Sequence, residues 1–137
     1  MTVIDLQTMR YINLLDRVSH VKTSKCFAYN NTIIFAVPRK LISRAIGSNA
    51  MNVKSIQDQL GKRVRVIGEA EGPRDLEQFV REIVSPVGFK SIEIKDNFVI
   101  LNAGSQSKAA LIGRNKRRFD ELKRIIQDNF SLDLKII

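Results

Sequence analysis

The sequence is poor in the residues that build metal centres, disulfides and covalent catalytic sites. Its 137 residues include one cysteine, one histidine and no tryptophan. Cys26 alone cannot form an internal disulfide or anchor a cysteine-based zinc site, and His20 has no partner at metal-ligand spacing. We therefore expect no metal site and no cofactor.

Candidates for catalysis are equally few. A nucleophile and base pair would have to be Cys26 and His20, which flank the end of a predicted helix. A histidine there suits the helix dipole, and the cysteine reads as a small core residue. The segment 104–108 lacks the second glycine and the final Ser/Thr of a Walker loop. We expect a protein that is not an enzyme and takes no small-molecule substrate.

Long hydrophobic runs are also missing. The longest apolar segments, 32–37 and 98–101, fall far short of the ~20 residues that cross a bilayer. The N-terminus has no signal-peptide pattern. These absences favour a cytoplasmic protein with no membrane contact.

A basic excess is the main compositional feature. Lysine and arginine number 23 against 14 aspartate and glutamate, for a net charge of +9. With 44% hydrophobic residues the chain can still fold around a core. Such a protein attracts polyanions. Aromatic residues make up only 7%, so base stacking on aromatic platforms is not the expected mode of binding.

The sequence contains an internal repeat. A shift of 66 residues places 31–36 on 97–102 and 45–49 on 111–115. The helices that follow 45–49 and 111–115 have apolar residues at the same spacing. These residues are Val53, Ile56 and Leu60 in the first copy and Phe119, Leu122 and Ile126 in the second. Two copies of one unit account for this pattern.

The first copy begins with an amphipathic helix and continues with a hairpin. The apolar face of this helix carries Ile4, Met9, Ile12, Leu15 and Val18. Two strands, 25–29 and 32–37, meet at Asn30-Asn31, a pair that favours a tight turn. A short helix then leads to Gly47, a longer helix ends at Gly61 in a left-handed cap, and a strand occupies 63–67.

The second copy follows the same order. Pro73 lies just inside its first helix, and Pro86 stops that helix. The predicted strands are 91–95, 98–101 and 132–136. We expect Asn129 to take the left-handed conformation at the end of the long helix.

These patterns predict an α+β protein of two domains, 1–70 and 73–137, joined by the short linker 68–72. Each domain has the order helix, strand, strand, helix, helix, strand. Each is expected to form a three-stranded sheet covered by helices.

The segments 45–53 and 111–116 resemble the GxxG loop region of KH domains, because each lies between two helices and follows an apolar strand. The element order resembles the type II KH domain. Two such domains in tandem are similar to the NusA-like transcription factors of archaea. The resemblance implies that each loop clamps the backbone of about four nucleotides, while the bases occupy a groove between the helices and the last strand.

The GxxG positions are Gly47, Ser48, Asn49 and Ala50 in the first copy and Gly113, Arg114, Asn115 and Lys116 in the second. A glycine at the turn lets the backbone approach a phosphate, and the amides opening the next helix carry partial positive charge. Both loops depart from the family pattern at the fourth position. Ala50 is small, so we expect close approach there. The Lys116 side chain either obstructs the phosphate or pairs with it.

Further candidate residues surround the two loops. Arg114, Lys116, Arg117 and Arg118 concentrate positive charge at the second loop, although residues 73–137 carry only 12 basic against 9 acidic side chains. Residues 1–72 carry 11 and 5. The resemblance further implies RNA contacts by Lys54, one turn after the first loop, by Arg65 on the strand facing the bases, and by the groove-floor residues Ile46 and Ile112.

The resulting hypothesis is a single-stranded RNA-binding, NusA-like factor acting in transcription termination or antitermination, with RNA polymerase as a candidate second partner. One alternative is a ribosome-associated or RNA-processing KH protein. Another is a protein-interaction module with degenerate loops, whose basic face docks an acidic partner. RNA base preference and oligomeric state lie beyond the sequence.

Overall fold

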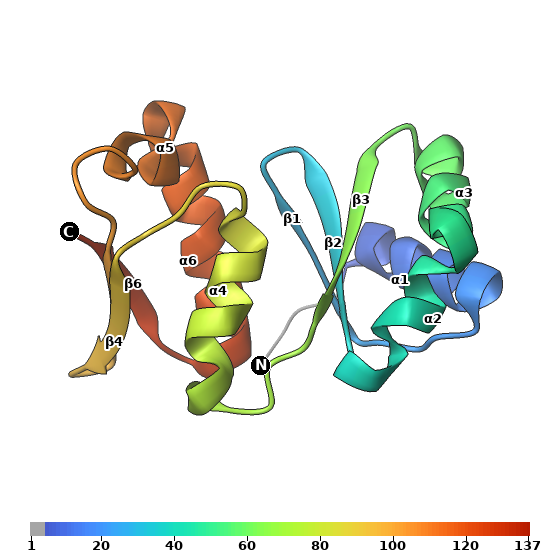
Figure 1. Ribbon diagram of the computed structural model, residues 1–137, viewed down its shortest axis with the longest axis horizontal. Helices are drawn as coiled ribbons and strands as arrows, with labels where there is room; N and C mark the ends of the chain where they lie inside the picture. Colours follow the sequence, from blue (N-terminus) through green and yellow to red (C-terminus); the bar gives the residue numbers. More distant parts are fainter. Residues whose placement is uncertain (1–4) are drawn as a thin grey trace. The chain divides into compact units, whose positions relative to one another are not determined.

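The computed structural model describes residues 5–137. This part of the chain folds as an α+β protein with two three-stranded sheets, which confirms the predicted class and sheet number. The chain divides into two compact units, of which the first ends at Glu69 and the second runs Ala70–Ile137. In each unit the helices cover one face of the sheet (Figure 1). No helix in the described residues is long and apolar enough to span a membrane.

The first unit contains a mixed sheet in the order β1-β2-β3. β1 pairs antiparallel with β2, and β2 pairs parallel with β3. A parallel neighbour requires a crossover, which the helices between β2 and β3 provide. The elements are α1 (Leu6–Ser19), β1 (Lys25–Tyr29), β2 (Thr32–Val37), η1 (Arg39–Leu41), α2 (Ile42–Ile46), η2 (Ser48–Ala50), α3 (Met51–Leu60) and β3 (Arg63–Gly68).

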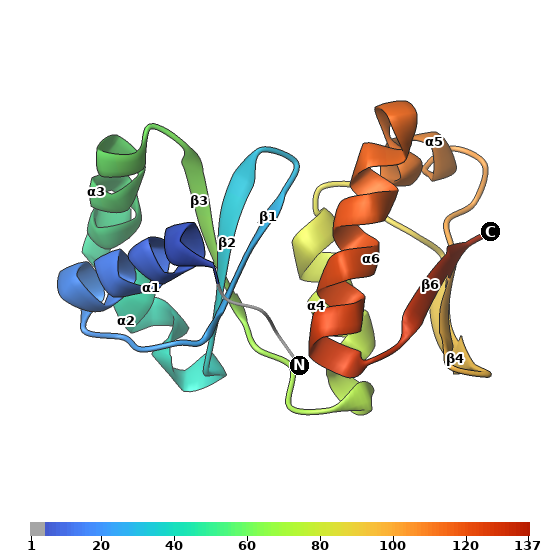
Figure 2. The same cartoon turned by 180° about the vertical axis from the view of Figure 1, so that it is seen from behind.

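The second unit has the same order of α-helices and strands and the same sheet pairing. β4 pairs antiparallel with β5, and β5 pairs parallel with β6. The elements are η3 (Pro73–Asp75), α4 (Leu76–Val84), β4 (Ser91–Lys95), β5 (Phe98–Asn102), α5 (Lys108–Ile112), η4 (Arg114–Lys116), α6 (Arg117–Phe130) and β6 (Asp133–Ile136). Figure 2 shows α4 and α6 on the same side of this sheet.

Both hairpins turn on residues in the left-handed conformation. The φ angles are 52° and 58° at Asn30 and Asn31, and 52° and 66° at Asp96 and Asn97. Two-residue hairpin turns of this kind need positive φ at both positions, which asparagine and aspartate tolerate better than most residues. The predicted turns are therefore confirmed.

The core of the first unit lies between the sheet and its three α-helices. Alternate residues of β2 face this core, and Ile56 from α3 is fully buried there. Each such side chain contributes about 1.5–3 kcal/mol by leaving water. The cluster comprises Leu14, Leu15, Val21, Ile33, Phe35, Val37, Ala45, Ile56 and Val64.

In the second unit the sheet contributes Val99, Leu101 and Leu134 to the buried residues. The ring of Phe79 on α4 meets that of Phe130 on α6 edge to face, with 5.7 Å between centroids. Arg81, on the same helix, stacks over the Phe89 ring at 4.1 Å and donates to the Phe89 carbonyl at 3.2 Å. These contacts tie α4 to α6 and to the segment before β4.

The first helix differs from the sequence pattern at its start and at Met9. Asp5 caps α1 by accepting the Thr8 backbone N–H at 2.7 Å, which lowers the pKa of that carboxyl. The helix therefore begins at Leu6, and Ile4 lies outside the described residues. Met9 was expected on the apolar face, but 47% of its surface is exposed.

The end of the long second-unit helix also differs. We predicted that Asn129 would end it, whereas Asn129 is helical and donates its side-chain amide to the Ile125 carbonyl at 2.8 Å. The helix reaches Phe130, whose ring packs on Phe79, and Ser131 takes the left-handed cap with φ of 57°. Tertiary packing extends the helix past the local signal. Gly61, by contrast, caps α3 as predicted, with φ of 64°.

Strand boundaries shift by one residue at three places. β3 continues to Gly68, which the sequence placed in the linker, and β5 continues to Asn102. β6 begins at Asp133, one residue later than predicted. Pairing with a neighbouring strand sets these ends, and Gly68 pairs with Val37 at the end of β2.

The reactivity of the Cys26 thiol tests whether this residue is buried against the core of the first unit. This half-buried β1 residue packs against the core cluster. Burial, with a smaller effect of the Asp5 carboxylate, raises the pKa of its thiol to about 12. At about pH 8 a thiol reagent should therefore label the folded protein at least about 100-fold more slowly than the urea-unfolded protein, because only the thiolate reacts. Glutathione in the same buffers is the control, and equal rates would contradict burial of Cys26.

Candidate nucleic-acid interface

The two glycine loops have the same backbone conformation. In each, the first, third and fourth residues have positive φ. These residues are Gly47 (81°), Asn49 (54°) and Ala50 (58°) in the first loop, and Gly113 (76°), Asn115 (56°) and Lys116 (60°) in the second. The ψ angles agree as well, at 166° for Gly47 and 171° for Gly113. The different side chains of the loops therefore leave the backbone path unchanged.

The first position of each loop has room only for glycine. A Cβ at Gly47 would lie 2.9 Å from Asn52 Cγ, and one at Gly113 would lie 2.6 Å from Arg118 Cγ. Both positions also have a φ that L side chains rarely adopt. The glycines let the second residue of the following helix pack directly on the loop.

Asn52 fixes this junction in the first unit, although the sequence analysis did not single it out. Its side-chain amide donates to the Arg44 carbonyl near the end of α2 at 3.0 Å. Asn52 thus links the start of α3 to the end of α2. The only sequence signal was its position five residues after Gly47, which Arg118 shares relative to Gly113.

The helices after the loops begin without a side-chain cap. Ala50 at the start of α3 and Lys116 at the start of α6 make no side-chain capping hydrogen bond within the described structure, in contrast to Asp5 at α1. The N-terminus of a helix has amides without intrahelical partners and a partial positive charge. An anion bound at either helix start would accept hydrogen bonds from these amides and interact favourably with the partial positive charge.

The fourth position of each loop has a strained backbone. Ala50 adopts the left-handed conformation at the start of α3, and so does Lys116 at the start of α6. This conformation costs a residue with a Cβ about 1–2 kcal/mol relative to glycine. Lys116 keeps its side chain exposed, and the lysine does not distort the loop.

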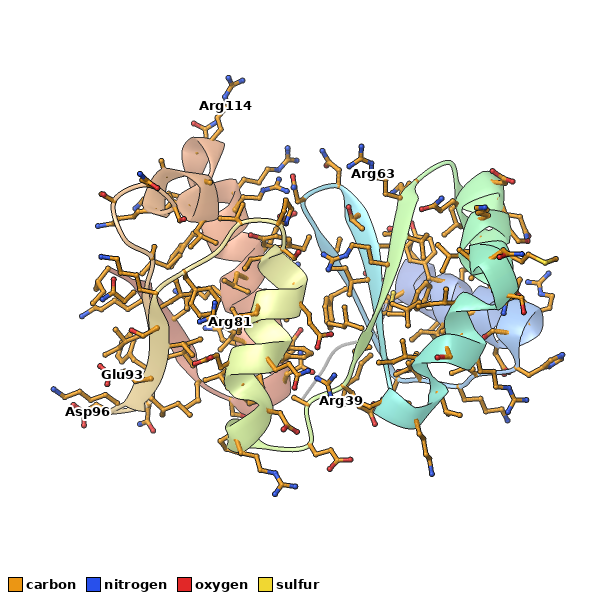
Figure 3. The ribbon with its side chains drawn as sticks, in the orientation of Figure 1. Arg39, Arg63, Arg81, Glu93, Asp96 and Arg114 are labelled. Atoms are coloured by element: carbon orange, nitrogen blue, oxygen red, sulfur yellow. The ribbon has the colours of Figure 1, made fainter. Side chains whose placement is uncertain are left out.

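Three of the four cations at the second loop are exposed, and the fourth is not. Arg114, Lys116 and Arg117 are exposed, and Arg114 projects outward from η4 (Figure 3). Arg118 has a side chain only 13% exposed, and its guanidinium forms an ion pair with Glu121 at 3.2 Å. Its stem packs beside Gly113. Arg118 therefore has a structural role at the loop.

In the first unit the candidates separate into two groups. Ser48, Asn49 and Lys54 are exposed at the loop and on α3, and Ile46 precedes the loop half-buried, as Ile112 does in the second unit. Arg65 pairs in register with Ile34, on the sheet face opposite to the core residue Val64. The structure thus does not bring Arg65 to the helix face of the sheet, because side chains alternate along β3.

The described residues contain no group of three His, Cys, Asp or Glu side chains that could hold a metal ion. The features available for binding are therefore backbone amides, exposed cations and partly buried apolar side chains. Together these suit a flexible polyanion.

Comparison with known proteins gives consistent relatives. The chain is 26% identical over 113 residues to the probable transcription termination protein NusA of Methanococcus vannielii, covering 80% of this chain and 64% of the relative. It is 23% identical over 128 residues to the protein of that name from Halococcus morrhuae, covering 91% and 90%. With the Thermoplasma acidophilum protein of that name it shares 22% over 134 residues, covering 95% and 91%.

A solved structure has the same fold. The crystal structure of a protein designated APE1850 matches with a TM-score of 0.69 and 24% identity, over 98% of this chain and all of that chain. No family model matches the sequence. The shared fold extends through both units.

Replacement of Ala50 by glycine tests the strain at the fourth position. Ala50→Gly should stabilise the protein by about 0.5–1 kcal/mol, because the relief of left-handed strain exceeds the entropy lost by a glycine on folding. The urea midpoint, followed by circular dichroism, measures the change. Ser48→Gly is the matched control, since Ser48 has no positive φ and should gain nothing. Equal shifts in both variants would rule out the strain.

Proposed function

We propose that this chain, which is similar to archaeal NusA proteins over most of its length, is a NusA-like transcription factor that binds single-stranded RNA. The observation that carries the proposal is the pair of glycine loops. Each opens an uncapped helix through the same backbone conformation and exposes polar or cationic side chains beside it.

We assign both units to the type II KH domain, with the first within 1–70 and the second within 73–137. Three features support the assignment. They are the order helix, strand, strand, helix, helix, strand, the parallel pairing of the last strand with the middle one, and the glycine loop between two helices. Each unit then presents one site for about four nucleotides.

In the proposed mechanism a phosphate lies against the glycine of each loop. Gly47 and Gly113 have no side chain to keep it away, and the amides at the starts of α3 and α6 point toward it with partial positive charge. The bases then lie along the adjacent helices, on apolar surface that includes Ile46 and Ile112. A single strand can place its bases there, whereas a duplex has them paired and stacked.

The two loops divide the interaction differently. In the first loop Ser48, Asn49 and Ala50 are small, so the phosphate meets mainly the backbone, with Lys54 one turn away. In the second loop Arg114, Lys116 and Arg117 are exposed cations that pair with phosphates directly. In a loop with glycine at the fourth position, only the backbone would contact the phosphate there. We therefore propose that the Lys116 side chain binds this phosphate.

The transcription role rests on the name of the relatives, probable transcription termination protein NusA. We propose nascent RNA as the ligand and RNA polymerase as the protein partner. The chain spans only 64% of the Methanococcus relative. Assigning the activity of that whole protein to this chain is therefore part of the proposal.

The first test of RNA binding is fluorescence anisotropy with labelled oligonucleotides. At low salt the protein should prefer single-stranded RNA to a duplex of the same sequence. If it neutralises about four phosphates, log K should fall against log salt with a slope of about −3. Equal affinity for duplex and single strand would overturn the proposal.

The second test addresses the loop cations. Arg114→Glu with Lys116→Glu should weaken single-stranded RNA binding at least about tenfold and flatten the salt dependence, because two phosphate contacts become repulsive. Arg10→Glu with Lys22→Glu is the matched control, since it makes the same charge change at exposed residues on α1 and the loop after it. If both pairs weaken binding equally, only net charge matters and the proposed loop site is wrong.

A different result would favour the protein-interaction alternative. The chain would then bind RNA polymerase but would bind neither single-stranded nor duplex RNA.

A further inference from the structure

The sheet of the second unit leaves one face open, and we propose that this face binds a second copy of the chain as a symmetric dimer. The helices of the unit cover the other face, where Val99 and Leu101 are fully buried. The proposal concerns the sheet of the second unit and not its glycine loop, and it does not depend on RNA binding.

Strand alternation determines which residues lie on the open face. Residues in register across a sheet point to the same side, and the neighbours of Val99 and Leu101 along β5 point to the other. In Figure 3 Glu93 projects from β4 on the side away from α4 and α6. The open face therefore carries two rows, Lys95, Phe98 and Asp133 in one and Glu93, Ile100 and Lys135 in the other.

Apolar side chains form the centre of this face. Phe98 is 36% exposed, and the partly exposed Ile100 lies two residues further along β5. The Lys135 ammonium lies 5.6 Å from the centroid of the Phe98 ring. Covering the exposed part of the Phe98 ring with another apolar surface would gain further hydrophobic free energy.

The charges around this centre alternate in sign. Lys95 and Glu93 lie on β4, and Asp133 and Lys135 lie on β6, so each row has one positive and one negative end. Asp133 also pairs with Lys123 on α6 at 3.5 Å, so its carboxylate lies at the β6 edge of this face, with 39% of its side chain exposed. The four charges cancel, which makes the face a poor match for a polyanion such as RNA.

This pattern is complementary to itself. A two-fold axis along β5 in the plane of contact would place Lys95 on the partner's Asp133 and Glu93 on the partner's Lys135. A two-fold axis across the strands, between the rows, would place Lys95 on the partner's Glu93 and Lys135 on the partner's Asp133. In both arrangements the apolar centres meet, and the strands of the stacked sheets remain aligned as in sheet-on-sheet packing. A surface that opposes its own charges correctly in both orientations fits a second copy better than an unrelated protein.

Sedimentation velocity of the full chain, from low to high micromolar concentration, tests the proposal. The wild-type protein should shift from monomer to dimer. Glu93→Lys and, separately, Phe98→Ser should raise the dimer dissociation constant at least about tenfold, since they remove a charge match and the apolar centre. Asp58→Lys makes the same charge change on the exposed surface of α3 and should leave the dimer intact.

Charge swaps identify the symmetry axis. Glu93→Lys with Lys135→Glu should restore the dimer if the axis runs along β5, and Glu93→Lys with Lys95→Glu should restore it if the axis runs across the strands. Each double variant is the control for the other. Restoration by one of them supports the proposal, and restoration by neither overturns it.

Three other outcomes would overturn the dimer. They are a monomeric wild-type protein at every concentration, a dimer indifferent to Glu93→Lys and Phe98→Ser, and loss of RNA binding in these variants without a change in mass. Circular dichroism shows whether each variant is folded, and the exposed Glu93 provides a test even if Phe98→Ser unfolds. RNA binding through the glycine loops should be unchanged in all of them, so failure of the dimer and failure of the proposed function remain distinguishable.

Discussion

The parallel pairing of the last strand with the middle strand is the constraint on which each unit depends. A parallel neighbour cannot be reached by a tight turn, so the chain must cross over the sheet, and two helices make the crossing. The helices must change direction sharply between them, and Gly47 or Gly113 provides that change in a conformation closed to other residues. The loop proposed to meet phosphate is therefore also the corner that lets the sheet form.

This dual role explains why the two loops differ in side chains but not in backbone. The path is set by the glycine and by the residue packed on it, Asn52 or Arg118. The remaining positions can vary as long as they accept the left-handed conformation, which Asn49, Ala50 and Lys116 do at some cost. Strain of this kind persists where the surrounding structure holds it, and such places are frequently functional.

The resemblance to archaeal NusA proteins, first visible in the repeated glycine segments, is confirmed by relatives that cover most of the chain. The α+β class, the element order and both hairpin turns could also be predicted, because alternation, apolar spacing and turn residues are local signals. Helix ends were less predictable. α6 extends past Asn129 because Phe130 packs on Phe79, and the sequence near Asn129 contains no local pattern that predicts this contact.

The sequence by itself determined the two sheets, the helices that cover them and the position of the glycine loops, since these follow from periodicities and from residues with special backbone freedom. Only the tertiary structure decided which cations are exposed. Arg118 lies in a run of four basic residues, yet it packs beside Gly113 and pairs with Glu121, whereas Arg114 and Lys116 are exposed. Arg65 likewise lies opposite the helices, because strand register assigns each side chain to a face. Charged residues can be counted along a sequence, but the direction in which each charged side chain points depends on contacts between residues that folding brings together.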